Sequence, residues 1–243
     1  VKGDLGQSAA GKTDKNGELT VPEVEQTERH GVYIVGYTDG TFGPSRSMTR
    51  SEAAAIFARL LAEKNGDTIS TAANTRFTDI PVHAWYSGYA KYLNNNGVTY
   101  GKSKTIFAPN DAITRAEFTT MAVRFFDVYG DGDAEIMEQF SGFNDVSSGY
   151  WAAEYIKYAA LHGWINGYGD GSFHADREIN RAEVVTIVNR LLGREADEDY
   201  IADNLRKLNT FPDVSRKHWA YYAVMEAANA HTAVLGESES WSK

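Results

Sequence analysis

The chain has 243 residues, a formal net charge of -9, and 23% charged and 42% hydrophobic residues, with no cysteine. These values are ordinary for a folded protein and exclude disorder throughout, and the net charge argues against a general nucleic-acid binder, which carries a basic face. The lack of cysteine excludes disulfides, thiol nucleophiles and cysteine-ligated zinc, and no run of residues approaches the roughly 18 apolar residues of a membrane span.

Residues 1–31 are interpreted as a linker or as the remnant of a preceding region. The string 14–17, Asp-Lys-Asn-Gly, resembles part of a calcium loop, but the first ligand position would fall on Lys12, which cannot coordinate calcium. A polar turn is the favoured interpretation, and no metal or cofactor is expected. The first residues do not form a signal peptide, so either one was removed or the chain is a piece of a longer protein. The second explanation is favoured, because the chain opens in the middle of a repeat.

Two marker strings recur along the rest of the chain, and internal repeats of this kind define the architecture. The first is a glycine-rich loop whose Phe stands seven residues before a polar-Arg-small-Glu tetrad, at 36–42 with 49–52, 101–107 with 114–117, and 167–173 with 180–183. The second is Phe-x-Asp with a Trp eight residues after the Phe, at Phe77, Asp79 and Trp85; Phe143, Asp145 and Trp151; and Phe211, Asp213 and Trp219.

The order of these strings divides the chain into two whole units and two half units. The half units are 32–62 and 211–231, the whole units are 77–126 and 143–192, the linkers are 63–76, 127–142 and 193–210, and the tail is 232–243. A half unit alone would leave an apolar face in water. We therefore predict a mostly α, pseudo-threefold ring of helix–loop–helix repeats in a monomer, in which the C-terminal half unit closes on the N-terminal one and the chain ends lie close together.

Each unit is expected to contain two helices. Apolar residues recur at helical spacing after each Trp, and Gly97 and Gly163 stand where these helices should end, whereas the last copy has His231. Each tetrad resembles a capping box that starts the second helix, with Asn180 as a variant. The glycine-rich loop between the helices predicts a tight turn, and the linker 193–210 is long enough for a short surface helix.

Arg50, Arg115 and Arg181 occupy the first helical position, where a cation is disfavoured by a few tenths to about one kcal/mol. Three such placements suggest a compensating anion. Two explanations stay open: an internal partner, such as Asp39, Asp170 or the tetrad Glu, or a carboxylate of a ligand. The arginines late in the same helices favour structural roles, and they are Arg59, Arg124 and Arg190.

The three tryptophans are either core anchors or platforms for stacking a sugar, and their position at the start of an amphipathic helix favours the core. The aspartates of Phe-x-Asp are expected to act in loops or caps, with a hydrogen bond to a sugar hydroxyl as the alternative. Glycine in the loop allows the backbone to approach a ligand closely.

In combination, these strings resemble the S-layer homology family over residues 32–231. The match is nearly letter for letter at 211–220, Phe-Pro-Asp-Val through His-Trp-Ala, and at 113–117, Ile-Thr-Arg-Ala-Glu. The resemblance implies a secreted, cell-wall-anchoring module that binds secondary cell wall polymer, typically its pyruvylated N-acetylmannosamine, in grooves between repeats. It also implies that the tetrad Arg contacts the pyruvyl carboxylate while the loop backbone and groove aromatics hold the sugar.

The candidate ligand-binding residues share a place in one of these strings. They are Arg50, Arg115 and Arg181; Gly36, Tyr37, Gly101, Gly167 and Tyr168; Trp85, Trp151 and Trp219; and Asp79, Asp145 and Asp213. The middle loop, 101–107, departs from the pattern because it lacks the Tyr, the Asp and the second Gly, so its groove is expected to be altered or silent. Lys102 and Lys104 can still attract an anion there.

Two alternative functions make different predictions. A module that self-assembles into a surface lattice predicts ordered oligomers without glycan. A glycoside hydrolase needs two carboxylates that face each other across a cleft, and the recurring acids are better explained as caps and turns.

Overall fold

The computed structural model describes residues 12–13, 19–20, 26–130, 140–235 and 239–242. The calcium-loop candidate at 14–17 and residues 131–139 of the linker 127–142 lie outside these ranges. The described helices are α1 (Arg50–Asn65), α2 (Ser87–Asn95), α3 (Arg115–Tyr129), α4 (Ala153–Leu161), α5 (Arg181–Leu192), α6 (Glu198–Asn204), the 3-10 turn η1 (Leu205–Lys207) and α7 (Tyr221–Ala228). The described strands are β1 (Lys12–Thr13), β2 (Leu19–Thr20), β3 (Gln26–His30), β4 (His231–Leu235) and β5 (Ser240–Ser242).

The protein is mostly α, as the repeat pattern predicts. Within the described residues, none of the helices combines the length and the apolar character needed to cross a membrane. The short helix expected in the linker 193–210 is present as α6.

The tetrads start the long helices as predicted. Thr49, Thr114 and Asn180 are the N-caps of α1, α3 and α5, and each forms a complete capping box with the Glu three residues later. The side-chain oxygen of the cap satisfies an otherwise unpaired backbone N–H at the helix start. Gly97 and Gly163 follow the ends of α2 and α4 with φ of 77° and 68°, the left-handed conformation that glycine adopts without strain.

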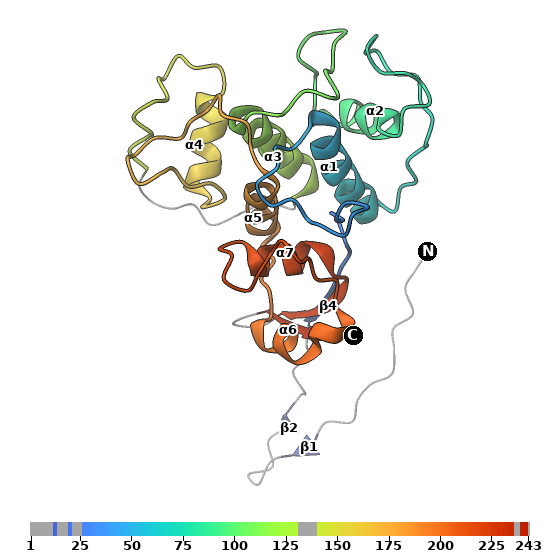
Figure 1. The fold of residues 1–243 in the computed structure, drawn as a ribbon, viewed down its shortest axis with the longest axis vertical. Helices are drawn as coiled ribbons and strands as arrows, with labels where there is room; N and C mark the ends of the chain where they lie inside the picture. The colour runs from blue at the N-terminus through green and yellow to red at the C-terminus, as the bar shows by residue number, and fades with distance from the viewer. Residues whose placement is uncertain (1–11, 14–18, 21–25, 131–139, 236–238, 243) are drawn as a thin grey trace.

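The helices associate in pairs, each made of one tetrad helix and the Trp helix of the next unit. The pairs are α1 with α2, α3 with α4, and α5 with α7. Figure 1 shows them as three lobes, with α4 and α2 on opposite sides at the top and α7 in the lower lobe. A continuous apolar core joins the pairs, and Phe57 lies against Phe118 and Phe125 where α1 meets α3.

Three backbone hydrogen bonds link the residues that precede the three tetrads into a closed ring. The N–H of Met48 donates to the carbonyl of Ile179 at 2.9 Å, Ile179 donates to Ile113 at 3.0 Å, and Ile113 donates to Met48 at 2.9 Å. All three side chains are fully buried. The segments that precede the three tetrad helices therefore contact one another directly.

The contact between the two half units matches a contact that occurs within each whole unit. Both carboxylate oxygens of Asp213 accept backbone N–H groups of Phe42 and Gly43, at 2.9 and 2.7 Å. The matching distances are 2.9 and 2.6 Å for Asp79, and 2.7 and 2.8 Å for Asp145. The C-terminal half unit thus supplies the Phe-x-Asp string, which the N-terminal half unit does not contain.

A small antiparallel sheet lies beyond the last helix pair, and no pattern in the sequence predicted it. Its strand order is β3-β4-β5, with His30 opposite His231. The sheet brings residues 26–30, from the segment interpreted as linker, beside residues 231–235, which follow the last half unit. Position 231, where the other copies end a helix with glycine, here begins a strand.

Candidate functional site

Two equivalent grooves lie between neighbouring copies. The first groove, of about 350 Å3, is lined by the segment 33–37, one face of α1, Arg181 and Trp85. The middle groove, of about 550 Å3, is lined by the segment 98–102, one face of α3, Arg50 and Trp151. Both therefore combine the glycine-rich loop, a tetrad helix, the tetrad arginine of another copy and the following tryptophan.

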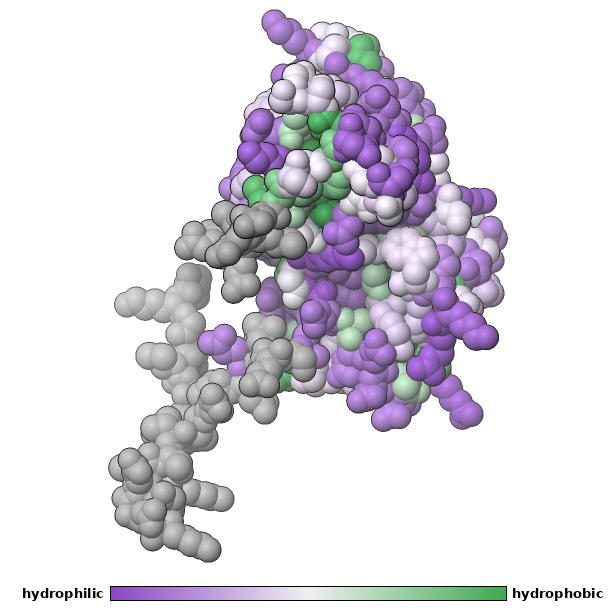
Figure 2. Space-filling model, turned by 90° about the vertical axis from the view of Figure 1, so that its left-hand side faces the viewer, coloured by the Kyte–Doolittle hydropathy of each residue, from purple (hydrophilic) through white to green (hydrophobic). Residues whose placement is uncertain are grey.

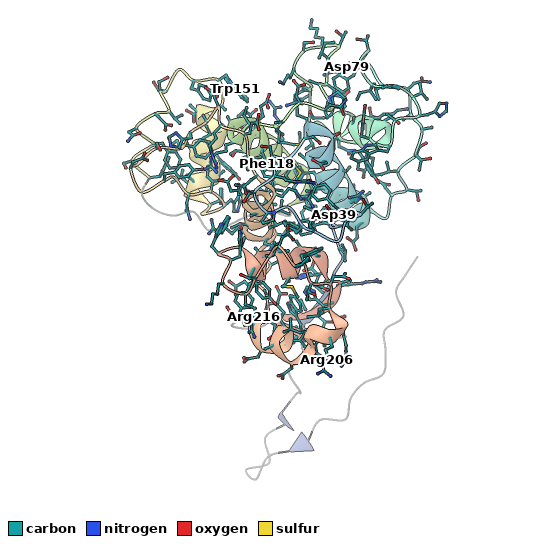
Figure 3. All side chains as sticks on the ribbon, viewed as in Figure 1. Asp39, Asp79, Phe118, Trp151, Arg206 and Arg216 are labelled. Carbon is teal, nitrogen blue, oxygen red and sulfur yellow. The ribbon has the colours of Figure 1, made fainter. Side chains whose placement is uncertain are left out.

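The tryptophans are not core residues. Trp85, Trp151 and Trp219 are 54%, 57% and 64% exposed, so the preference for a core role was wrong. Each lies just before its helix, not within it, and the core of that helix is filled by smaller residues such as Ala90 and Ile156. Figure 3 shows Trp151 at the upper side of the α3–α4 lobe.

An indole that stays exposed to water does not contribute the free energy that burial of its large apolar surface would add to folding. Figure 2 shows that on the α4 side of the molecule hydrophilic residues surround only a small area of hydrophobic ones. The three exposed tryptophans therefore contribute little buried apolar surface to the fold.

The three tetrad arginines are buried and have partners within the protein. Their side chains are 4–6% exposed. Each Nε donates to the carbonyl of a loop Phe, at 2.7 Å for Arg50, 2.8 Å for Arg115 and 2.8 Å for Arg181. Burial lowers the pKa of each guanidinium, and the nearby acidic and phenolic groups oppose this shift.

A terminal guanidinium nitrogen of each arginine also approaches the tetrad Glu of another copy. Nη1 lies 3.2 Å from a carboxylate oxygen in the pairs Arg50–Glu117 and Arg115–Glu183, and 4.0 Å in the pair Arg181–Glu52. These contacts agree with the internal-partner explanation, and the partner is the tetrad Glu of another copy. The loop acids Asp39 and Asp170 are not the partners, because each bonds the hydroxyl and N–H two residues further along its own loop.

The loop residue after the first glycine makes a different contact in the middle copy than in the other two. The ring of Tyr37 lies against Arg181, and the ring of Tyr168 lies against Arg115, with centroid distances of 4.7 and 5.1 Å. The middle copy has Lys102 at this position, paired with Asp111 at 2.9 Å. The expected alteration of the middle copy thus appears as a wider groove beside Arg50, not as a closed one.

The late arginines contribute to the grooves more than the sequence suggested. Arg59 lines the first groove and lies over the Tyr89 ring, and Arg124 lines the middle groove and bonds the Tyr155 hydroxyl. Nine residues separate Arg50 from Arg59, which places them on opposite sides of α1. Arg59 therefore faces Arg181 of another copy across a groove, and this helical spacing was the signal available in the sequence.

The candidate aspartates hold the loops in place. Because Asp79, Asp145 and Asp213 each receive two backbone N–H groups, their carboxylates are already engaged, although Asp145 and Asp213 remain exposed. These hydrogen bonds lower the pKa of Asp145 and Asp213 against the opposing effect of burial. The loop-and-cap interpretation of these residues agrees with these contacts.

The first glycine of each loop lies in close contact with its surroundings. A Cβ on Gly167 would approach Phe143 to 2.5 Å and the Ser172 carbonyl to 2.6 Å, and Gly36 and Gly101 are similarly enclosed. Nothing lies within 4 Å of a Cβ built on Gly169, in the same loop. We expect Gly167→Ala to lower the free energy of unfolding by about 1–3 kcal/mol, as overpacking does, and Gly169→Ala to change it little. Urea unfolding of both variants checks this, and equal effects would contradict the packing described.

Three helix pairs that share one apolar core, with aromatic and arginine-lined grooves between copies, define a repeat-built helical module. The family model for the S-layer homology domain matches residues 20–54, 76–119 and 142–185. The chain belongs to the S-layer homology family, as its repeat strings predicted. Family membership also assigns it to the cell surface of the secreting cell, in agreement with the expected location.

Two curated relatives come from Acetivibrio thermocellus. The chain is 33% identical to cell surface glycoprotein 1, and the match covers 86% of this chain and 9% of the glycoprotein. It is 30% identical to a cellulosome-anchoring protein over 95% of its own length and 49% of that protein. The chain therefore spans half or less of these relatives.

Some relatives are enzymes. Exoglucanase XynX of Acetivibrio thermocellus is 31% identical over 65% of this chain, but the match covers only 14% of that enzyme. The family and the anchoring relative together indicate a non-catalytic module.

Proposed function

We propose that this module anchors a surface protein to the cell wall by binding an anionic wall glycan, a secondary cell wall polymer with pyruvylated N-acetylmannosamine, in its grooves. The observation that carries the proposal is the repeated pairing of an exposed tryptophan with two arginines from different copies in one groove. An aromatic face suits the apolar face of a sugar ring, and a guanidinium suits a carboxylate.

The middle groove serves as the template. Trp151 supplies the stacking face, the backbone at Gly101 approaches the sugar, and the acid group lies between Arg50 and Arg124. Because Arg50 is nearly buried and paired with Glu117, Arg124 makes the more accessible contact. In the first groove the corresponding residues are Trp85, Gly36, Arg181 and Arg59.

We further propose that the three copies form a pseudo-threefold ring within one monomer, with a third groove at Trp219, Arg115 and Tyr168. The closed ring of backbone hydrogen bonds and the three matching aspartate contacts support this arrangement. Three sites on one module bind a repeating polymer with higher avidity than a single site. Lattice assembly predicts oligomers, so light scattering that shows a stable monomer supports anchoring over assembly.

The test is calorimetric titration with fragments of the purified polymer and with the same fragments after removal of pyruvate. We expect binding that weakens as salt is raised and at least a tenfold loss of affinity without the carboxylate. Equal affinity for both preparations would contradict the proposed role of the arginines. Chain cleavage of the polymer during incubation would instead revive an enzymatic function.

A further inference from the structure

Two histidines and two glutamates that the anchoring proposal does not use meet inside the lower lobe. His30 ends β3, His231 begins β4, Glu226 lies on α7, and Glu239 precedes β5. The side chains of His30 and His231 are 3% exposed, Glu226 0% and Glu239 5%. The cluster therefore brings residues near the start of the described chain together with residues near its end, and their side chains are almost fully buried.

Five of the separations between possible ligand atoms are close to those around a tetrahedral ion, and the four ligand atoms all lie within 4.8 Å of one another. His30 Nδ1 lies 3.2 Å from His231 Nε2, 3.3 Å from Glu226 Oε1 and 3.3 Å from Glu239 Oε1. His231 Nε2 lies 3.3 Å from Glu226 Oε2 and 3.2 Å from Glu239 Oε1. A zinc ion bound at about 2.0–2.1 Å in tetrahedral geometry separates its ligand atoms by about 3.3–3.4 Å. One ion at the centre can therefore reach all four side chains with small adjustments.

The surrounding contacts orient the ligand atoms inward. His231 Nδ1 lies 3.0 Å from the Asn229 carbonyl, which fixes the proton on Nδ1 and leaves the Nε2 lone pair for a metal. Glu239 receives the Glu195 N–H on Oε2 and the Trp241 indole N–H on Oε1. Trp241 also stacks on the His231 ring at 3.8 Å. Such outer contacts are what hold the ligands of a metal site in place.

Glu226 provides an independent observation. Among the described residues, no donor has hydrogen-bond geometry to either of its buried carboxylate oxygens, and the nearest polar atoms are the two histidine nitrogens at 3.3 Å, which form ion pairs with Glu226 only when they are protonated. A buried carboxylate without hydrogen bonds is costly unless a charge compensates it. The buried Arg194 is close enough to influence His30 but donates no hydrogen bond to Glu226.

We propose that His30, Glu226, His231 and Glu239 form a closed tetrahedral site for a divalent transition-metal ion of the zinc type. Two imidazoles and two carboxylates suit zinc, whereas calcium requires six or more oxygen ligands. A closed site with four protein ligands has no open position for substrate, so its role is structural. The ion fastens β3 to α7 and β4, and thereby holds the C-terminal half unit against the N-terminal one.

The test uses the whole chain without a histidine tag, freed of metals by a chelator and dialysis and then incubated with excess Zn2+ or Co2+. We expect one zinc ion per chain by elemental analysis after desalting, and an intense visible absorption from tetrahedral Co2+ that added zinc removes. The thermal midpoint should rise by about 5 °C with excess zinc and remain unchanged with calcium. The proposal is overturned if the cobalt complex lacks tetrahedral absorption or if no zinc is retained. In that case the four side chains share protons and bind no metal ion.

Substitution of the proposed ligands tests where the ion binds. Glu226→Gln keeps the shape of the side chain and should lower zinc affinity at least 100-fold, as should His30→Asn. The controls, His83→Asn and His174→Asn, alter partly or fully exposed histidines outside the cluster and should retain one zinc ion. Zinc retained by Glu226→Gln and His30→Asn would overturn the assignment. If either variant does not fold, the cobalt spectrum of the unaltered chain decides.

Discussion

Replacing Arg50 with alanine is expected to lower the free energy of unfolding by about 3–5 kcal/mol, as removing one partner of a buried ion pair does. The change leaves Glu117 without its guanidinium and the Phe107 carbonyl without its donor. Arg59→Ala is the matched control, because Arg59 is the same residue type, exposed, on the same helix. It should cost no more than about 1 kcal/mol.

Chemical unfolding of both variants measures the difference. A cost below 1 kcal/mol for Arg50→Ala would mean that the guanidinium is not committed to the fold and is free for an external acid. The expected large cost has a practical consequence. Lost glycan binding in a tetrad-arginine variant does not identify a binding residue unless the variant is shown to be folded.

The groove tryptophans provide the cleaner test of binding. Trp151→Ala should weaken binding of polymer fragments at the middle groove by about 30-fold, which corresponds to about 2 kcal/mol for a central aromatic contact. Trp85→Ala should have a similar effect at the first groove. Because both rings are more than half exposed, the free energy of unfolding should change by less than about 1 kcal/mol.

Val128→Ala is the control, since Val128 is an exposed apolar residue that does not line either groove. Titration of each variant with the same fragments gives the affinities. Unchanged affinity in the double variant Trp85→Ala and Trp151→Ala, with the fold intact, would place the binding site elsewhere.

Much of the fold could be predicted from the sequence because its signals are local. Capping boxes at Thr49, Thr114 and Asn180 fix the starts of three helices, and the glycines after α2 and α4 mark two ends. The sheet β3-β4-β5 could not be predicted in this way, because it pairs residues about 200 positions apart and its strands are short. Long-range pairing of this kind leaves no local pattern.

The candidate site was predicted as a set of residues but not with their roles. The sequence singled out the tetrad arginines from their place at helix starts, but it could not show that Arg50 reaches Glu117 in another copy. It favoured a buried Trp151, because helical spacing does not distinguish a residue at the helix start from one in its core. It grouped Arg124 with structural residues, because the groove that Arg124 lines is formed only when two copies meet.

The most direct test of the account is a crystal structure of the protein with a pyruvylated disaccharide from the wall polymer. We predict that the sugar ring stacks on Trp151 in the middle groove, with its carboxylate within hydrogen-bond distance of Arg124 or Arg50. A sugar bound outside the grooves, or a groove ligand whose carboxylate points away from both arginines, would contradict the proposed mechanism.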